Sequence, residues 1–171
     1  MAAEILIGVM IISVGVYLFN VMGQYSAEKT SQMEDTQIAQ FNQQFLKYYG
    51  DITTEENGSQ VTGPIRCTIH EIVGLANLAK KVNTENGFTE PQKVTDYANY
   101  PNFYVEIDVQ IGSKNYTNLE AKSQEELVNL IKENDVVSQN GNTGIKYFKC
   151  IEEPGISNIT KRVNYMKFVE I

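Results

Sequence analysis

The stretch Ile5–Met22 reads ILIGVMIISVGVYLFNVM, and the interpretation of the whole chain starts from it. Its 18 residues carry no charge and only one strongly polar side chain, Asn20. A helix rises ~1.5 Å per residue, so this stretch would be about 27 Å long, close to the ~30 Å hydrocarbon core of a bilayer. The stretch therefore predicts a single membrane-spanning helix.

Two other interpretations of this stretch fit less well. A cleaved secretory signal needs a basic start, a shorter apolar run and a small-residue cleavage site, and no Lys or Arg precedes Ile5. A buried core helix is normally apolar on one side only, whereas this stretch is apolar all round. A membrane span remains the favoured prediction.

The charges beside the stretch and in the whole chain indicate where it lies. The C-terminal flank holds more acids than bases, so it offers no basic anchor for the cytoplasmic side. We therefore expect a cytoplasmic N-terminus and a C-terminal domain outside. The 171 residues include 14 Lys and Arg against 21 Asp and Glu, a net charge of −7, which argues against a nucleic-acid partner.

The helical pattern continues beyond Met22. Apolar residues recur at steps of 5, 3, 4 and 3, at Met33, Ile38, Phe41, Phe45 and Tyr48. This spacing is typical of an amphipathic helix, and Gly50 is a stop signal. The sequence predicts one domain over 1–50, a membrane-spanning and amphipathic helix, and a second over 51–171, an extracytoplasmic head.

The head mixes helix and strand signals. Capping boxes at Thr68–Glu71 and Ser123–Glu126 predict two helices. Alternation over Phe103–Ile111 predicts a half-buried antiparallel strand, and Ile145–Ile151 and Arg162–Ile171 are further strands. Loops are expected at 53–63, 92–102 and 138–144. The predicted fold class is α+β: a long N-terminal transmembrane and amphipathic helix, then a small antiparallel sheet packed with two helices.

Few residues carry a recognisable chemistry. Cys67 and Cys150 either form a disulfide or are two buried small side chains, and their spacing alone does not decide between these. One His and two Cys 83 positions apart do not furnish a usual zinc site. His70 has no partner identifiable by motif, and paired acids such as Glu125-Glu126 are explained as solvated faces or helix starts. We predict no metal, no cofactor and no enzymatic activity.

The start of the chain resembles a known family. An acidic residue, Glu4, stands just before an apolar helix that runs on into an amphipathic half, and this resembles type IV pilin-like proteins, above all the TadE-like pseudopilins of tight-adherence pilus loci. The resemblance covers about the first 50 residues. Two features depart from the pattern: no basic leader precedes the helix, and Glu4 is one place short of the usual fifth position.

The resemblance implies an assembly role for the N-terminal residues. In such proteins a glutamate near the N-terminus pairs with the terminal amine of a neighbouring subunit, and Glu4 is the position that matches; the alternative is a Glu4 that lies in the headgroup layer. Gly8 and Gly15, seven apart on one helical face, would permit close approach of helices. The expected partners are membrane lipid, sister or related pilin subunits and the membrane assembly machinery.

Three functions therefore follow from the sequence. The leading prediction is a non-enzymatic pilin-like subunit of a pilus or secretion-type filament at the cell surface. The second is a single-pass accessory subunit of a larger membrane complex, and the third is a membrane-anchored extracellular binding domain. A filament subunit would form homotypic assemblies, an accessory subunit would appear at fixed stoichiometry, and a binding domain would need a concave pocket with converging polar groups.

Overall fold

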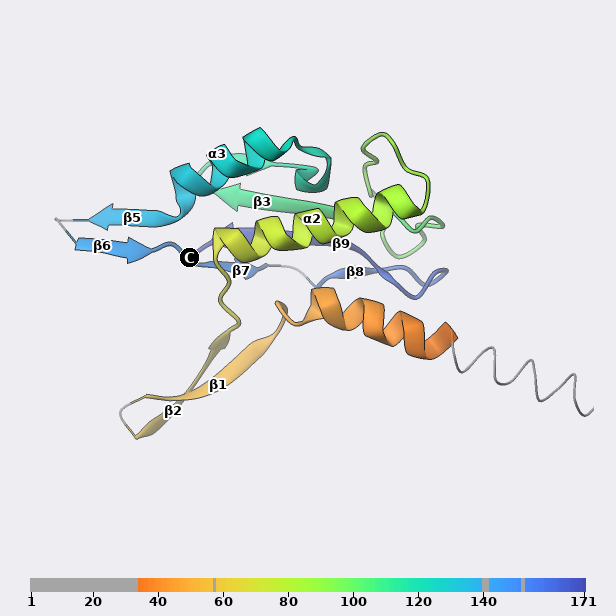
Figure 1. Cartoon of the computed structure of the whole chain (residues 1–171). Helices are drawn as coiled ribbons and strands as arrows, with labels where there is room; N and C mark the ends of the chain where they lie inside the picture. The colour runs from red at the N-terminus through yellow and green to blue at the C-terminus, as the bar shows by residue number, and fades with distance from the viewer. Residues whose placement is uncertain (1–33, 57, 140–141, 152) are drawn as a thin grey trace, which may run out of the picture. The chain divides into compact units, whose positions relative to one another are not determined.

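The computed structural model describes residues 34–171 except 57, 140–141 and 152 (Figure 1). The chain divides into two compact units, residues 1–40 and 41–171. In the first unit residues 34–40 are described and are helical, and the helical conformation continues to residue 46 in the second. The second unit, called the head below, contains β1 (Asp51–Glu56), β2 (Ser59–Pro64), α2 (Ile69–Glu85), β3 (Glu106–Ile111), β4 (Lys114–Tyr116), the 3₁₀ turn η1 (Leu119–Ala121), α3 (Gln124–Asn134), β5 (Val136–Gln139), β6 (Asn142–Ile145), β7 (Phe148–Cys150), β8 (Gly155–Ile156) and β9 (Val163–Glu170).

Both predicted capping boxes are present, and they start the two helices as expected. In α2 the Thr68 hydroxyl accepts from the Glu71 N–H, while the Glu71 carboxylate accepts from the Thr68 N–H at 2.8 Å. In α3 Ser123 and Glu126 form the same pair. Each box satisfies amide groups that the first helical turn leaves without intrahelical partners.

The main sheet is mixed rather than antiparallel. Its strand order is β4-β3-β9-β7, and β8 also pairs with β9. The two central strands, β3 and β9, run parallel, with Ile107 opposite Met166 and Val109 opposite Phe168. Strands β4, β7 and β8 are antiparallel to their neighbours. A parallel central pair is usually covered on both faces, and that is the case here.

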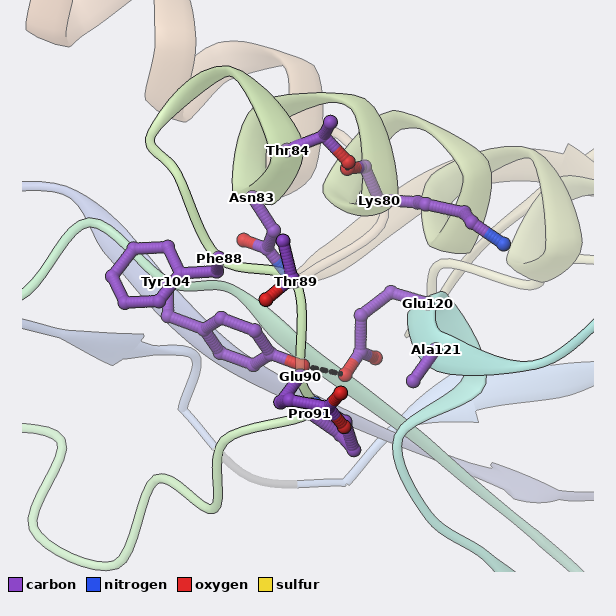
Figure 2. A pocket seen from close by; sticks show the side chains of 10 residues that line it. All are labelled: Lys80, Asn83, Thr84, Phe88, Thr89, Glu90, Pro91, Tyr104, Glu120 and Ala121. Carbon is purple, nitrogen blue, oxygen red and sulfur yellow. Dashed lines mark hydrogen bonds between the residues drawn. The ribbon is translucent and has the colours of Figure 1, made fainter.

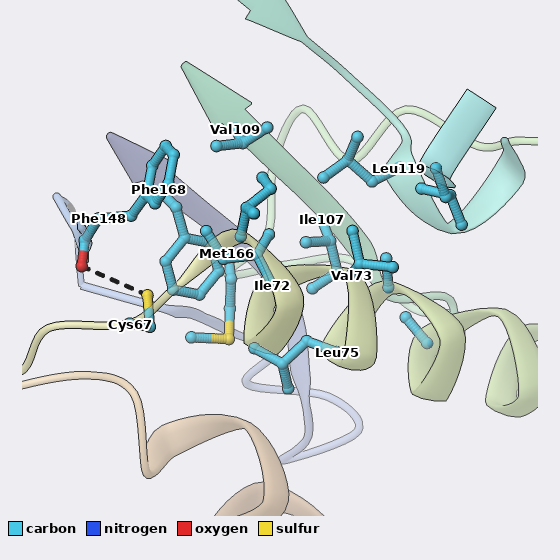
Figure 3. Packing of buried hydrophobic residues seen from close by; sticks show 14 of the residues in the cluster. Cys67, Ile72, Val73, Leu75, Ile107, Val109, Leu119, Phe148, Met166 and Phe168 are labelled. Carbon is cyan, nitrogen blue, oxygen red and sulfur yellow. Dashed lines mark hydrogen bonds between the residues drawn. The ribbon is translucent and has the colours of Figure 1, made fainter. Parts of the chain in front are cut away.

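Helix α2 covers one face of the sheet and forms the core with it (Figure 3). The apolar stripe predicted for this helix is buried, including Ile69, Ile72 and Ala76. It packs in one cluster with the inward residues of β3 and β9, among them Ile107, Val109, Met166 and Phe168, and with Leu127 and Leu130 of α3. Burial of this apolar surface is the main contribution to the stability of the head.

An irregular segment between α2 and β3, residues 88–104, lies over the other face of the sheet. We call it the strap. The Val94 N–H donates to the Glu106 carboxylate at 2.6 Å, and the Tyr97 ring stacks on Tyr165 of β9 with 5.6 Å between ring centroids. Because of this cover, Glu106 is 3 % exposed; Asp108, which lies on the same face of β3, is 8 % exposed. The prediction that this strand is half-buried was therefore wrong, because β3 is buried on both faces. Its expected antiparallel pairing is present with β4, whereas its pairing with β9 is parallel.

The predicted fold needs a correction. Among the residues that the structure describes, no helix is both long and apolar enough to cross a membrane. Together with the parallel β3–β9 pair, this contradicts the expected fold of a long transmembrane helix followed by an antiparallel sheet. The described part of the chain is α+β, with a mixed sheet and two additional hairpins. Ile5–Met22 lies outside the described residues.

The two hairpins occupy segments that were expected to be loops. Strands β1 and β2 pair antiparallel from Asp51 opposite Pro64 to Glu56 opposite Ser59, over the predicted loop 53–63 and the residues on either side of it. Strands β5 and β6 pair antiparallel within and beside the predicted loop 138–144. The irregular segment expected at 92–102 is confirmed as part of the strap.

Candidate functional site

The predicted assembly residues cannot be placed in the structure. Glu4, Gly8 and Gly15 lie outside the described residues, as does the rest of Ile5–Met22. Their role in assembly stays a prediction. The described features taken up below are the residues at the end of the helix that stops at residue 46, two exposed hairpins, a small pocket beside α2 and the two cysteines.

Residues 41–46 fix the end of the N-terminal helix to the head. Phe45 is fully buried in the core, and its ring lies 5.1 Å from that of Phe41. The Asn42 side chain donates to the Lys161 carbonyl at 2.9 Å and accepts from the Val163 N–H at 2.9 Å. One amide thus holds both sides of the turn before β9, so residues 41–46 are part of the head.

Arg162 adds a second attachment at the same place. Its guanidinium carbon lies 5.1 Å from the centre of the Phe41 ring and 4.8 Å from that of Phe103. A guanidinium between two aromatic faces is attracted by both ring quadrupoles. The end of the helix, the strap and the turn before β9 therefore meet at one side chain.

The hairpin β1–β2, called the first ribbon, is a sheet of its own, and within the described part of the chain it has no third strand (Figure 1). Ile52 and Val61 are 53 % and 45 % exposed, and they line a groove with Thr54 and Gly63. On the other face the Thr53 and Thr62 hydroxyls lie 2.9 Å apart. A free hairpin with an exposed apolar face is marginally stable in water, and such a surface is typical of an interaction site.

The hairpin β5–β6, called the second ribbon, has a similar exposed pair. Val136 and Ile145 lie opposite each other across the two strands. They are 49 % and 56 % exposed. The head therefore presents two free two-stranded ribbons, each with a cross-strand group of apolar side chains in contact with solvent.

A small pocket lies between α2, the start of the strap and η1 (Figure 2). It holds about 70 Å³ of space that a water molecule can enter. Drug-sized ligand pockets measure ~300–1,000 Å³, so this one suits a few water molecules rather than an organic substrate. Lys80 and Thr84 of α2 stand at one side, and Tyr104 and Glu120 at the other.

Two polar side chains of the pocket, Tyr104 and Glu120, are bonded to each other. The Tyr104 hydroxyl donates to the Glu120 carboxylate at 2.7 Å, and the Ile107 N–H donates to the other oxygen at 2.9 Å. The Asn118 side-chain amide donates to Glu120 at 3.0 Å. Burial, followed by the adjacent carboxylate, raises the pKa of Tyr104 well above its usual range, which keeps its proton on the phenol. This arrangement ties η1 to β3 and the strap, and we assign it a structural role.

The two cysteines are close in the fold but are present as thiols. Cys67 forms an antiparallel bridge with Phe148, and its thiol donates to the Phe148 carbonyl at 3.4 Å (Figure 3). Cys150 follows in the same strand, β7. Burial raises the pKa of Cys67 to about 12, and the charges of Glu71 and Cys150 add to this. A neutral, buried thiol is a poor nucleophile and a poor metal ligand.

The other candidate residues lie apart from one another. The His70 Nε2 is 3.2 Å from a carboxylate oxygen of Asp135, and both side chains are largely exposed. Glu126 serves the capping box of α3, as the first-turn position predicted. Within residues 34–171, leaving out the undescribed positions, no group of three or more His, Cys, Asp or Glu is placed to hold a metal ion.

Sequence reasoning missed the ribbons, although a signal for them was present. Asn57-Gly58 separates β1 from β2, and Asn140-Gly141 separates β5 from β6. Asn-Gly between two short runs is the strongest short-range signal for a two-residue hairpin, because both positions need positive φ. Gly58 has φ +77°. The role of Asn42, in contrast, has no local signal in the sequence.

Comparison of the chain with protein-family models, with curated proteins and with solved structures finds no match.

Proposed function

We propose that this chain is a non-enzymatic, membrane-anchored, pilin-like subunit that assembles through its N-terminal segment into a pilus or secretion-type filament. One observation carries the proposal: an uncharged apolar stretch, Ile5–Met22, stands behind a single acid, Glu4, and is joined to a water-facing head of different composition. The rest of the chain carries all the other charges and forms a core of its own.

The chemistry of the N-terminal residues suits packing between copies. A carboxylate in an apolar environment is unfavourable unless it is paired, and the terminal amine of a neighbouring copy is a suitable partner for Glu4. Gly8 and Gly15 lack side chains, so two helices can approach closely along their face. The stretch would hold the chain in the membrane before assembly and pack against sister stretches afterwards, with the head outside.

The base of the helix supports the same proposal. Phe45 is fully buried in the head and Asn42 bonds both sides of the turn before β9. Residues 41–46 therefore belong to the folded head rather than to a free linker. This is the connection that a filament subunit needs.

The two ribbons supply surfaces that neighbouring heads would cover. Each has an exposed apolar group on one face, around Ile52 and Val61 in the first ribbon and around Val136 and Ile145 in the second. In a filament of identical subunits the contacts are heterologous, so different surfaces of one copy meet along the assembly. We propose that the apolar faces of the ribbons lie against adjacent copies of this chain.

The test is the substitution Glu4→Ala in the full chain, expressed with its assembly partners. We expect the variant to stay in the membrane fraction but to lose incorporation into cross-linked oligomers or fibres, because its apolar stretch is intact while the ion pair is gone. Glu34→Ala, which removes an exposed acid of the helical residues 34–46, is the matched control and should assemble normally.

Two outcomes would overturn the proposal. If Glu4→Ala is incorporated into oligomers or fibres as fully as the wild type, the pilin-like mechanism is wrong. Recovery of the wild-type chain at a fixed ratio to unrelated membrane proteins, with no contacts between copies, would favour the accessory subunit instead.

A further inference from the structure

The strap is held to the sheet by contacts from several elements. The Asn164 side chain of β9 donates to the Tyr97 carbonyl at 2.8 Å, and the Ser157 hydroxyl donates to the Tyr100 carbonyl at 2.6 Å. The Asn118 side chain donates to the Gln92 carbonyl at 2.9 Å. These bonds are between neutral groups. The contact between Val94 and Glu106 is different, because it is made by an ionisable side chain.

Glu106 lies under the middle of the strap on the central strand β3. Its side chain is 3 % exposed, and its carboxylate accepts from the Val94 N–H at 2.6 Å. None of the ion pairs found among the described residues includes Glu106. A buried carboxylate without a paired cation is unfavourable when ionised, because the protein replaces only part of its hydration.

The charged and titratable groups around Glu106 come from every element that packs on it. Asp108 stands two residues along on the same face of β3, and Glu120 lies on η1; both oppose a negative charge on Glu106. Lys93 of the strap favours that charge. Two phenols complete the surroundings, Tyr100 of the strap and Tyr165, which is paired with Glu106 in the register of β3 and β9.

Together these surroundings favour the protonated carboxyl. Burial is the largest effect, and it raises the pKa of Glu106 to about 7, against the opposing effect of the Val94 hydrogen bond. A protonated carboxyl still accepts this hydrogen bond and carries no buried charge.

From the burial of Glu106 beneath the strap, without a paired cation, we propose that the strap is a pH-dependent cover on the outer face of the sheet, closed while Glu106 carries a proton and loosened when Glu106 is ionised. Loosening would separate Tyr97 from Tyr165 and expose Val94, so a new surface would appear as the pH rises. This proposal does not depend on the proposed function, since it concerns the head alone.

The direction of the effect follows from proton linkage. An exposed glutamate has a pKa near 4.3–4.5, so the closed strap binds the Glu106 proton more tightly than the open strap does. Between about pH 5 and pH 7, opening of the strap releases this proton. The equilibrium constant for opening should therefore rise by up to about tenfold per pH unit. Above about pH 7 both states are ionised, and the dependence should level off.

The experiment is hydrogen exchange by mass spectrometry on the full chain across this pH range, expressed as protection factors of strap peptides. We expect protection in residues 88–104 to fall from about pH 5 to pH 7 while peptides of α2 keep theirs. In Glu106→Gln, which keeps an acceptor for Val94 but cannot ionise, strap protection should stay high throughout. Glu90→Gln, an exposed strap carboxyl, is the matched control and should behave as the wild type.

Asp108 provides a second control, because burial also raises its pKa. Its carboxylate accepts from the Asn118 N–H at 2.9 Å and not from the strap. In Asp108→Asn the protection of the strap should therefore still depend on pH. Its transition should move toward lower pH, because the variant lacks the Asp108 charge that opposes ionisation of Glu106.

Two results would overturn the proposal. One is a strap whose protection factors do not change with pH in the wild type, or change equally in Glu106→Gln. The other comes from the wild type alone and does not depend on how the variants fold: a carbon-13 titration in which the Glu106 carboxyl ionises near pH 4.5.

Discussion

At the scale of single residues, Glu120 is a buried acid with several hydrogen-bond donors around it. It is 2 % exposed and accepts from Tyr104, from the Ile107 N–H and from Asn118. Three donors aimed at one carboxylate replace the water that it loses on burial. Its neighbour Glu106 accepts from one such donor, the Val94 N–H.

We predict that Glu120→Ala lowers the free energy of unfolding by ~2–4 kcal/mol, because buried donors of three different segments lose their acceptor. Tyr104→Phe should lower it by about 1 kcal/mol, since only one donor is removed and the acceptor keeps two others. Urea denaturation at fixed pH measures both. Glu125→Ala, an exposed acid of α3, is the control and should change stability by less than ~0.5 kcal/mol. Equal, small losses in all three variants would contradict the structural role of Glu120.

Cys67 allows a second prediction at this scale. Its side chain is fully buried and its pKa is raised to about 12, so the thiolate that reacts with alkylating agents is almost absent at pH 8. We expect iodoacetamide to leave Cys67 unmodified in the native chain and to modify it once urea unfolds the head, with mass spectrometry as the readout. Rapid native modification of Cys67, or a disulfide to Cys150, would show that this part of the core is not packed as described.

At the scale of elements, one side chain secures the end of the N-terminal helix. Asn42 bonds Lys161, which has φ +58°, and Val163, the first residue of β9. We predict that Asn42→Ala destabilises the head by ~1–3 kcal/mol, because it leaves a backbone donor and acceptor without their partner. Gln43→Ala, an exposed neighbour on the same helix, should change stability by less than ~0.5 kcal/mol. Thermal unfolding of both variants makes the comparison, and equal midpoints would mean that the Phe45 contact alone holds the helix.

Local signals predicted the helices of the head well. Thr68 and Ser123 start helices because their side chains satisfy amides only three residues away, so sequence spacing contains the whole interaction. The same holds for the buried stripe of α2, whose period follows from helix geometry.

Non-local features were beyond the sequence for a physical reason. The parallel pairing of β3 with β9 joins Glu106 to Tyr165, 59 positions apart, and alternation in β3 does not reveal its partner or its direction. Likewise, no local sequence pattern indicates that the strap covers this face of the sheet. The alternation therefore predicted an exposed face of β3 at Glu106 and Asp108, whereas in the structure this face is buried.

The ribbons were missed because most of their residues are polar and neither face is buried. A strand is usually recognised by one apolar face, and DITTEE in β1 has a single apolar side chain, Ile52. The pairing there is held by the turn and the backbone rather than by a core.

This difference leads to a prediction for the ribbons. Changing Ile52 and Val61 together to Thr keeps β-branched residues in both strands, so the stability of the head should change by less than ~0.5 kcal/mol. If the apolar face lies against neighbouring copies, chemical cross-linking between copies should fall. The change Thr53→Val on the opposite face is the control, and it should leave cross-linking as in the wild type. Undiminished cross-linking in the double variant would exclude this face from the assembly.

At the scale of the whole molecule, the chain combines an apolar N-terminal stretch with a head of net negative charge. All but one of the charged side chains follow Met22. A head with a net negative charge stays soluble and repels other heads at long range. Contacts between copies therefore have to come from specific surfaces. The N-terminal stretch and the ribbons are the apolar surfaces that the sequence and the structure offer for this purpose.

The position at which the head begins gives the last prediction. Phe45 is fully buried in the core, and Asn42 bonds the turn before β9, so residues 41–50 complete the head although the sequence places them in the N-terminal domain. A chain of residues 41–171 should be soluble and unfold in one cooperative transition, and a chain of residues 25–171 should match its stability. A chain of residues 51–171 should be severely destabilised, since loss of a buried Phe alone removes ~3–5 kcal/mol from a total of ~5–15 kcal/mol. Calorimetry of the three chains decides the matter. If residues 51–171 unfold at the same temperature as residues 41–171, then the Phe45 and Asn42 contacts contribute nothing to the head, and the N-terminal segment is joined to it only by the covalent chain.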